Sequence, residues 1–318
     1  MSLPVVSLSL ASAAEPAAPL RSTYRPSRPL DLIGTLDPLR RGAGDPCHQL
    51  AADGTVWRTF HTPHGPGTLA LRQSAGGEVS ATAWGSGADW LLATLPDLLG
   101  HRDDDSGFVP GPRLRESYRR HAGLRVTRCR RVLEMVIPAV LEQKVTGGQA
   151  RRAWRYLLSR YGTPAPGPGP RGLIVMPAPR AWRRIPSWEW HRAGLEGARA
   201  RTVIMAADVA GRLEETTSMG HAEAGVRLRA VPGIGPWTAA EVLQRAHGDP
   251  DALSVGDFHL PTQVGWALLG RPVDDARMIE LLEPWRGQRY RAARLLVLSS
   301  PRAPRFGPRY APQDLRDC

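Results

Sequence analysis

The sequence predicts an α+β protein, with a small antiparallel β-rich domain at the N-terminus followed by an all-α region. Short segments between residues 55 and 84 are rich in β formers and are separated by glycine turns, which is typical of a strand meander. Beyond residue 113, apolar side chains recur at helical spacing instead. Two of the predicted helices are joined by a glycine hairpin at residues 231–237, which indicates a tight helix–helix connection.

The composition divides the chain into four parts. Residues 1–29 begin alanine-rich and lack the positively charged start of a secretory signal, so we expect a disordered leader. The β-rich domain and its linker occupy residues 30–112, and the helical region occupies residues 113–300. A basic, proline-rich tail forms residues 301–318. No stretch reaches the roughly 20 apolar residues that span a bilayer, so we expect no membrane partner.

The β-rich domain is expected to hold three strands and one covering helix. The strands lie at residues 55–60, 68–72 and 79–84, with turns at residues 65–67 and 76–77. A helix over residues 88–99 can cover one face of this sheet. The acidic run that follows, at residues 103–105, lacks the spaced carboxylates of a calcium loop, and we interpret it as a solvated linker.

The helical region is expected to begin with an apolar helix over residues 132–141, in which Pro138 predicts a kink. Thr146 and Gln149 form a capping box for the next helix. The full set of predicted helices is 132–141, 147–161, 179–185, 197–215, 222–230, 237–246, 261–269, 275–282 and 287–298.

The hairpin has the sequence VPGIGPWTA at residues 231–239. We expect Gly233 and Gly235 to adopt the positive φ of a tight turn and to leave the backbone amides uncovered. Gly235 is then the N-cap of the next helix, and Pro236 is its first residue. The free amides at this helix start suit a phosphate, which predicts a unit that grips a nucleic-acid backbone without reading bases. An ordinary connection between two helices stays open as the alternative.

An acidic residue, Asp257, follows the hairpin after a turn-rich linker at residues 248–251 and precedes an apolar run. An aspartate at this place serves as the N-cap of the next helix, or as a fixed carboxylate that acts on a bound substrate. The residues by themselves leave both interpretations open.

The hairpin followed by Asp257 resembles the helix-hairpin-helix DNA glycosylases, and most of all the type II 3-methyladenine DNA glycosylases of alkylation repair. The resemblance covers residues 123–300 and includes residues 141–146 (LEQKVT) and 284–286 (PWR). It is specific at the hairpin and at Asp257, and looser elsewhere. It implies that the helical region forms two subdomains with the active site in the cleft between them, and that Asp257 is the catalytic residue.

The resemblance also implies the other site residues. Those that bind the DNA backbone through the hairpin are Gly233, Ile234, Gly235, Trp237 and Thr238. Those that line the base pocket or enter the duplex are Gln143, Lys144, Trp237 and Glu241. Relatives can hold a monovalent cation at the hairpin carbonyls; we expect no other cofactor and no metal bound by side chains. The three scattered cysteines are too few for the four-thiolate iron–sulfur cluster of some relatives.

The chemistry implied by the resemblance begins with a damaged nucleotide swung out of the stack. The N-glycosidic bond then breaks through an oxocarbenium-like sugar, which a carboxylate beside C1′ stabilises while it orients the attacking water. Bifunctional relatives carry a nucleophilic lysine at the position of Trp237. Because tryptophan cannot attack, we expect a monofunctional enzyme that releases purines of the 3-methyladenine or 7-methylguanine type and leaves an abasic site.

Departures from the family pattern keep other functions open. Glu241 stands where relatives often carry tyrosine, and a tryptophan expected near Leu296 is missing. Lys144, the only lysine, stands where type II relatives insert an apolar wedge, and we expect it to contact the gap or a phosphate rather than to act in catalysis. A glycosylase for an oxidised or mismatched base and a non-catalytic helix-hairpin-helix DNA-binding protein stay as alternatives.

The charge of the chain agrees with a nucleic-acid partner. The formal net charge is +12 and the sequence pI is near 10.7, an excess of positive charge that suits phosphate. No disulfide framework is evident, which fits a reducing compartment. We therefore expect a monomer that binds damaged double-stranded DNA in the cytoplasm, associated with the nucleoid.

Overall fold

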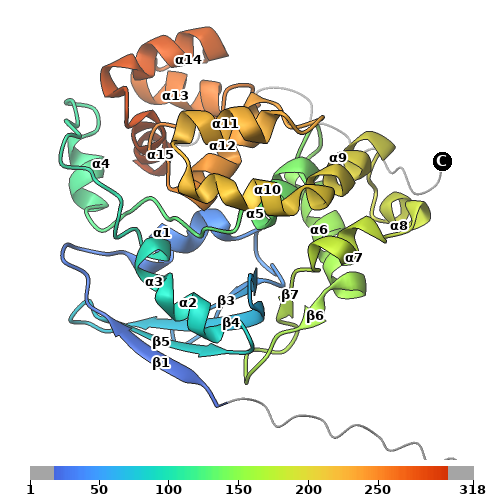
Figure 1. Ribbon diagram of the computed structural model, residues 1–318. Coiled ribbons are helices and arrows are strands. Elements are labelled where there is room, and N and C mark those ends of the chain that lie inside the picture. Colours follow the sequence, from blue (N-terminus) through green and yellow to red (C-terminus); the bar gives the residue numbers. More distant parts are fainter. Residues whose placement is uncertain (1–17, 300–318) are drawn as a thin grey trace, which may run out of the picture.

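The computed structural model describes residues 18–299, which form one sheet layer beneath a larger body of helices (Figure 1). The predicted α+β class is confirmed. The predicted tail and residues 1–17 of the predicted leader lie outside the described residues. Among residues 18–299, no helix combines the length and apolar character needed to cross a membrane.

Five antiparallel strands form the sheet, in the order β1-β5-β4-β3-β2. Their bounds are β1 Leu20–Tyr24, β2 His48–Leu50, β3 Val56–Thr62, β4 Gly65–Gln73 and β5 Val79–Trp84. The last three are the predicted meander, with Phe60 opposite Gly67 and Leu69 opposite Ala83. Residues 65–67, predicted as a turn, are instead the paired start of β4. Alternate residues of β5 are buried, because one face of the sheet packs into the core while the other faces outward.

Strand β1 corrects the predicted disordered leader. Residues 20–24 pair antiparallel with β5, from Leu20 opposite Ala83 to Tyr24 opposite Val79. All but the last of these side chains are exposed, so no apolar alternation marks the strand in the sequence. The strand forms because it pairs the backbone groups of β5, which would otherwise be an open sheet edge.

The helices follow the predicted order, with two predicted helices divided. Their bounds are α1 Leu32–Leu36, α2 Ala88–Ala93, α3 Leu95–Leu98, α4 Arg115–Arg120, α5 Val132–Leu141, α6 Gly147–Tyr161, α7 Pro179–Arg183, α8 Ser187–Arg192, α9 Gly197–Asp208, α10 Ala210–Glu214, α11 His221–Arg229, α12 Pro236–Val242, α13 Leu260–Leu269, α14 Asp275–Leu282 and α15 Arg289–Ser299. Two short antiparallel strands, β6 Thr163–Pro164 and β7 Ile174–Val175, pair at the base of a loop rich in proline and glycine. The predicted helix 197–215 breaks at Val209 and the predicted helix 88–99 breaks at Thr94. The capping box of Thr146 and Gln149 is confirmed.

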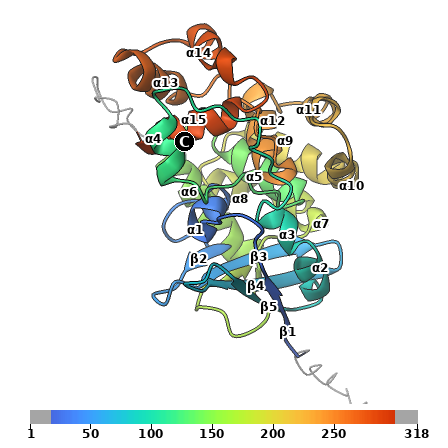
Figure 2. The same ribbon diagram turned by 90° about the vertical axis from the view of Figure 1, so that its left-hand side faces the viewer.

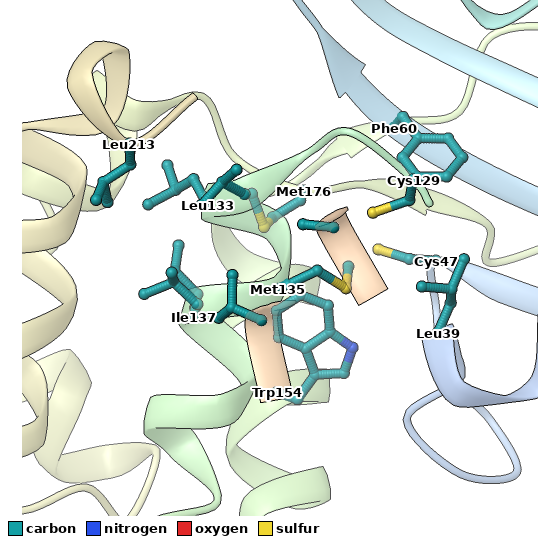
Figure 3. Packing of buried hydrophobic residues seen from close by; sticks show 14 of the residues in the cluster. Leu39, Cys47, Phe60, Cys129, Leu133, Met135, Ile137, Trp154, Met176 and Leu213 are labelled. Atoms are coloured by element: carbon teal, nitrogen blue, oxygen red, sulfur yellow. The ribbon is translucent and has the colours of Figure 1, made fainter. Parts of the chain in front are cut away.

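Helix α5 lies at the centre of the larger of two cores. All of its residues are buried, Pro138 included, and it packs against α9, α10 and α12. Figure 3 shows Met135 of α5 and Trp154 of α6 facing Leu39 and Cys47 of the N-terminal domain. A smaller core gathers α4 with α13, α14 and α15. The helices therefore form two groups, as the predicted subdomains require.

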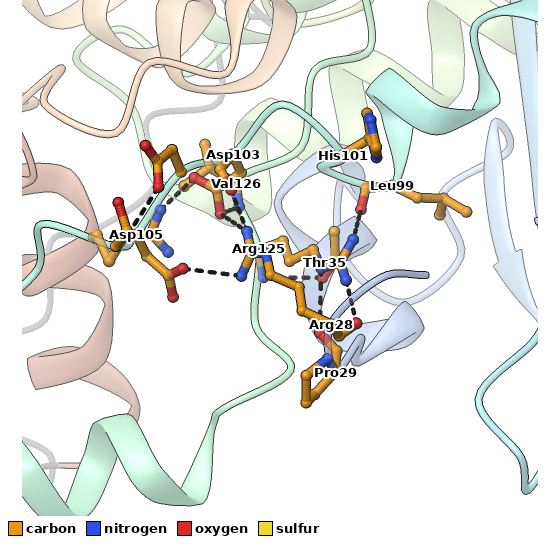
Figure 4. A network of polar contacts seen from close by, with 12 residues as sticks. Arg28, Pro29, Thr35, Leu99, His101, Asp103, Asp105, Arg125 and Val126 are labelled. Atoms are coloured by element: carbon orange, nitrogen blue, oxygen red, sulfur yellow. Dashed lines mark hydrogen bonds and ion pairs between the residues drawn. The ribbon is translucent and has the colours of Figure 1, made fainter. Parts of the chain in front are cut away.

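A buried ionic network corrects the predicted solvated linker at residues 103–105 (Figure 4). Asp103 is 7 % exposed and accepts hydrogen bonds from the Arg291 guanidinium and from the Val126 backbone amide, the latter at 2.9 Å. Arg125, which is also buried, donates to the backbone carbonyls of Arg28 and Leu99. The acidic run thus ties α15 to the N-terminal domain, through partners too distant in the sequence to be foreseen.

Candidate active site

The two glycines of the hairpin play different parts. Gly233 has φ +89, and a Cβ there would lie 2.0 Å from Oγ1 of Thr202 on α9, so the turn requires glycine as predicted. The positive φ predicted for Gly235 is wrong, because its φ is −88. Gly235 is nevertheless the N-cap of α12 and Pro236 its first residue, as predicted. A Cβ on Gly235 would meet nothing within 4 Å, so this side of the turn is open.

The hairpin is bonded to the turn between α5 and α6. The side-chain amide of Gln143 donates to the Gly233 carbonyl at 2.9 Å and to Thr238 Oγ1 at 2.8 Å. The side chains of Ile234 and Thr238 are buried. A ligand at the hairpin would therefore meet the backbone of these two residues rather than their side chains. Gln143, predicted to line the base pocket or to enter the duplex, here connects the turn after α5 to the hairpin and to α12.

Lys144 occupies a strained backbone conformation at the tip of that turn. Its φ is +53, and its side chain is exposed. A left-handed backbone costs a residue with a Cβ on the order of 1–3 kcal/mol, and such residues cluster at functional sites. The conformation presents Lys144 to solvent beside the Gln143–Gly233 contact, which is the place that the family resemblance gives to a residue that fills the gap in the duplex.

Asp257 and Trp237 are joined by a hydrogen bond. The indole Nε1 of Trp237 donates to Oδ2 of Asp257 at 2.9 Å. The other oxygen, Oδ1, accepts from the backbone amides of His259 and Leu260, each at 2.8 Å. Asp257 therefore caps the turn that leads into α13 and also contacts the first turn of α12. The N-cap of α13 itself is His259, so Asp257 is not the N-cap, and its action on a bound substrate stays a prediction.

The three donors to Asp257 are all neutral N–H groups. Neutral donors fix the direction of a carboxylate, but they leave its negative charge in place. A salt bridge would instead cancel most of that charge at short range. Asp257 is thus a fixed carboxylate whose field is available to whatever lies beside it.

Glu241 is placed neither in an open base pocket nor in solvent. Its side chain is buried; Oε1 accepts from Ser254 Oγ at 2.7 Å, and Oε2 forms an ion pair with Arg245 at 2.9 Å. Burial is the largest single influence on the pKa of Arg245 and lowers it, but Glu241, Tyr290 and Glu142 together hold the pKa above its ordinary value. Arg245 also donates to the Pro38 carbonyl at 2.8 Å, which connects this pair to the N-terminal domain.

Two site residues, Ser254 and Gln244, had no signal in the sequence. The Gln244 amide donates to the Ala252 carbonyl at 2.8 Å and to Ser254 Oγ at 2.9 Å. With Glu241, these bonds fasten the loop that carries Asp257 onto α12. A serine and a glutamine next to a charged helix residue are common in any sequence, so only the fold shows that they belong together.

No metal site is visible in the described part of the chain. Within residues 18–299, no three or more histidine, cysteine, aspartate or glutamate side chains are grouped so that they could hold a metal ion. The Gly233 carbonyl, one of the predicted ligands of a monovalent cation, accepts the Gln143 amide. Cation binding at the remaining hairpin carbonyls stays a prediction.

Comparison with known proteins relates the sequence to a DNA repair enzyme and the fold to DNA glycosylases. No protein-family model matches the chain. It is 28% identical over 216 residues to a probable bifunctional transcriptional activator/DNA repair enzyme AlkA of Mycobacterium tuberculosis. The match covers 65% of this chain but only 43% of that protein, so the chain spans less than half the length of this curated relative.

Solved structures show the same fold at low sequence identity. A 3-methyladenine DNA-glycosylase from Archaeoglobus fulgidus superposes with a TM-score of 0.72 at 17% identity, over 87% of this chain and 97% of that one. An 8-oxoguanine glycosylase/lyase from Clostridium acetobutylicum gives 0.66 at 14% identity, over 87% and 95%. The chain therefore has the fold of these DNA glycosylases, and over part of its length its sequence is similar to AlkA.

Proposed function

We propose that the protein is a monofunctional DNA N-glycosylase of base excision repair, which hydrolyses alkylated purines from duplex DNA and leaves an abasic site. The observation that carries this proposal is the contact of Trp237 with Asp257, at 2.9 Å. It sets an aromatic ring and an uncancelled negative charge side by side at the start of α12. An aromatic surface for a base and a carboxylate for a sugar are the two groups that the reaction needs.

Asp257 is suited to the bond-breaking step. As the C1′–N bond breaks, its electron pair leaves with the base and positive charge develops on the sugar. A preoriented carboxylate stabilises that charge without reorganisation. Water then attacks C1′ and gives up a proton, which the same carboxylate can accept. Because the donors to Asp257 are neutral, its charge is not already used by a cation.

The absence of an amine at residue 237 supports hydrolysis over strand cleavage. A Schiff base at C1′ requires a nucleophilic amine, and the group beside Asp257 is an indole whose N–H is bonded to the carboxylate. Lys144 is exposed on the neighbouring turn, next to Gln143, which is bonded to the hairpin. We assign it to the gap or to a phosphate.

The aromatic ring at the site favours a cationic alkylated purine as the preferred lesion. Trp237 offers an electron-rich ring that attracts a cationic alkylated purine, worth about 1–2 kcal/mol where water is excluded. Glu241 adds no free negative charge, because Arg245 neutralises it. The relatives named for DNA repair and for 3-methyladenine support this class. An oxidised purine is the second candidate, since an 8-oxoguanine glycosylase/lyase has the same fold.

The proposal is tested with duplexes that contain 3-methyladenine, 7-methylguanine, 8-oxoguanine or no lesion. We expect release of the free alkylated base, with strands that break only after alkali. Borohydride added during the reaction should trap no covalent complex, either in the wild type or in Lys144→Ala. Release of 8-oxoguanine alone would move the enzyme to the second candidate. No base released from any duplex, or a trapped adduct, would contradict the proposal.

A further inference from the structure

Phe258 is the most exposed of the large apolar side chains in the described part of the chain. It is 88 % exposed, although phenylalanine is normally buried. Within residues 18–299, its one ring contact is an edge contact with the neighbouring His259, at 5.0 Å between centroids. Single exposed apolar residues are common and need no explanation. Phe258 differs because it directly follows Asp257 and stands at the entry to α13.

The surface around Phe258 is continuous with the rest of the site. Asp257 is bonded to Trp237, and the hairpin that precedes Trp237 is bonded to Gln143. Lys144, the hairpin and Phe258 therefore belong to segments held together by direct hydrogen bonds. The chain as a whole is strongly basic, with net charge +12. An apolar ring in such a setting is suited to a partner that is both anionic and aromatic.

We infer that Phe258 packs against the damaged DNA strand, at the nucleotide next to the one swung out. This inference rests on the proposed function. If Asp257 reaches C1′ of the extrahelical nucleotide, the next residue along the chain lies about 3.8 Å away at its Cα. A ring that points into solvent from that position meets the adjoining sugar or the face of a base left without its stacking neighbour. Covering that face replaces the stacking lost when the nucleotide leaves the duplex.

The first test measures affinity without depending on the preferred lesion. The probe is a duplex with a tetrahydrofuran abasic analogue, compared with an undamaged duplex of the same sequence, by fluorescence anisotropy. Stacking of one base on an aromatic side chain corresponds to roughly 5- to 150-fold in affinity, and we expect about 10-fold weaker binding for Phe258→Ala. Phe258→Leu should fall between the two, because it keeps apolar area without an aromatic face.

Trp188→Ala is the matched control. Trp188 is also an exposed aromatic residue, 61 % exposed, but it lies on α8, on the opposite side of the helical body from α13 (Figure 1). This variant should bind like the wild type. Equal losses in Trp188→Ala and Phe258→Ala would overturn the inference, because they would indicate a general effect of surface aromatics. A Phe258→Ala protein with wild-type affinity would overturn it too.

The second test locates the contact. 2-Aminopurine is placed beside the abasic analogue, first in the same strand and then in the opposite strand. Phe258→Ala should lose most of the fluorescence change of the same-strand probe and keep that of the opposite-strand probe; the reverse pattern would contradict the assignment.

The wild type separates the two hypotheses. If it releases base and binds the analogue while Phe258→Ala behaves identically, only the inference about Phe258 fails. If the wild type binds neither duplex, both the inference and the proposed function fail.

Discussion

Asp257 and Glu134 are two carboxylates held by hydrogen bonds in different regions of the same molecule. Glu134 lies in the first turn of α5 and is 3 % exposed, where it pairs with Arg58 at 3.4 Å and accepts from the His61 backbone amide at 2.6 Å. Asp257 lies at the surface of the smaller core, where Trp237 and two backbone amides are its donors. One carboxylate faces a cation, and the other faces only neutral groups.

This difference separates a carboxylate whose charge stabilises the fold from a carboxylate whose charge is available for catalysis. Burial raises the pKa of Glu134, and the nearby Arg58 opposes this only in part. The negative charge of Glu134 is therefore occupied in holding Arg58 inside the protein. No cationic side chain pairs with Asp257 in the described residues, so its negative charge can stabilise a cationic transition state. Substitutions should affect stability in the first region and rate in the second.

The largest effect is expected for Glu134→Gln. The change leaves the Arg58 guanidinium buried without its strongest partner, which should lower the free energy of unfolding by about 3–5 kcal/mol. Denaturant unfolding measures this loss, and base release per folded molecule should stay unchanged. If the variant is as stable as the wild type, the distinction between the two carboxylates does not hold.

The two hairpin glycines sharpen the comparison within the site itself. Gly233→Ala places a Cβ 2.0 Å from Thr202 Oγ1 at a positive φ, and should cost about 1–3 kcal/mol of stability together with DNA affinity. Gly235→Ala meets nothing and should keep its stability, yet weaken the binding of damaged and undamaged duplexes equally by covering the backbone. Thermal unfolding and anisotropy report the two effects, and equal destabilisation by both changes would refute the distinction.

Protonation of His247, a residue outside the candidate active site, should lower the stability of the protein at acid pH. Burial, together with the charge of His221, lowers the pKa of His247 from 6.5 to about 4. A depressed pKa gives stability that is present above pH 6.5 and is lost as the pH falls toward 4. We expect a loss of roughly 1–3 kcal/mol across this range, measured by unfolding at successive pH values. His247→Gln should flatten that part of the profile; a profile as steep as the wild type's would assign the loss to another group.

The smallest effect is expected for Ser254→Ala. The change removes the hydroxyl that joins Glu241 and Gln244, so the loop that carries Asp257 is held less firmly. One such bond is worth about 0.5–1.5 kcal/mol, which corresponds to at most about a ten-fold loss of kcat. KM should stay unchanged. Ser218→Ala removes an exposed bond to the Glu215 carbonyl and serves as the control. A change in KM with an unchanged kcat would argue against a role of Ser254 in positioning Asp257.

Local signals predicted much of the fold. The meander of β3, β4 and β5 follows from alternating β formers and glycine turns, and the start of α6 follows from Thr146 and Gln149. The family pattern also singled out Trp237 and Asp257 as site residues, and the structure shows a hydrogen bond between them that the sequence did not predict. These features depend on neighbouring residues or on a recurrent motif, which a sequence displays directly.

The remainder depends on contacts between distant parts of the chain. Strand β1 exists because β5 offers an edge, and Asp103 is buried because Arg291 reaches it from α15. Glu241 finds Ser254 only once the loop before Asp257 folds back onto α12. Single residues of these types have no periodicity or fixed spacing. Their roles therefore become visible only in the folded protein.

The central claim is that the uncancelled charge of Asp257 drives base release, and single-turnover kinetics of Asp257→Asn test it most directly. Asparagine keeps the shape and one acceptor oxygen but removes the charge. With a duplex containing 7-methylguanine and saturating enzyme, we expect the rate of base release to fall by roughly 10²–10³, or about 3–4 kcal/mol of barrier. Affinity for an abasic-analogue duplex and the free energy of unfolding should be retained. An Asp257→Asn protein that releases base at the wild-type rate would contradict the claim.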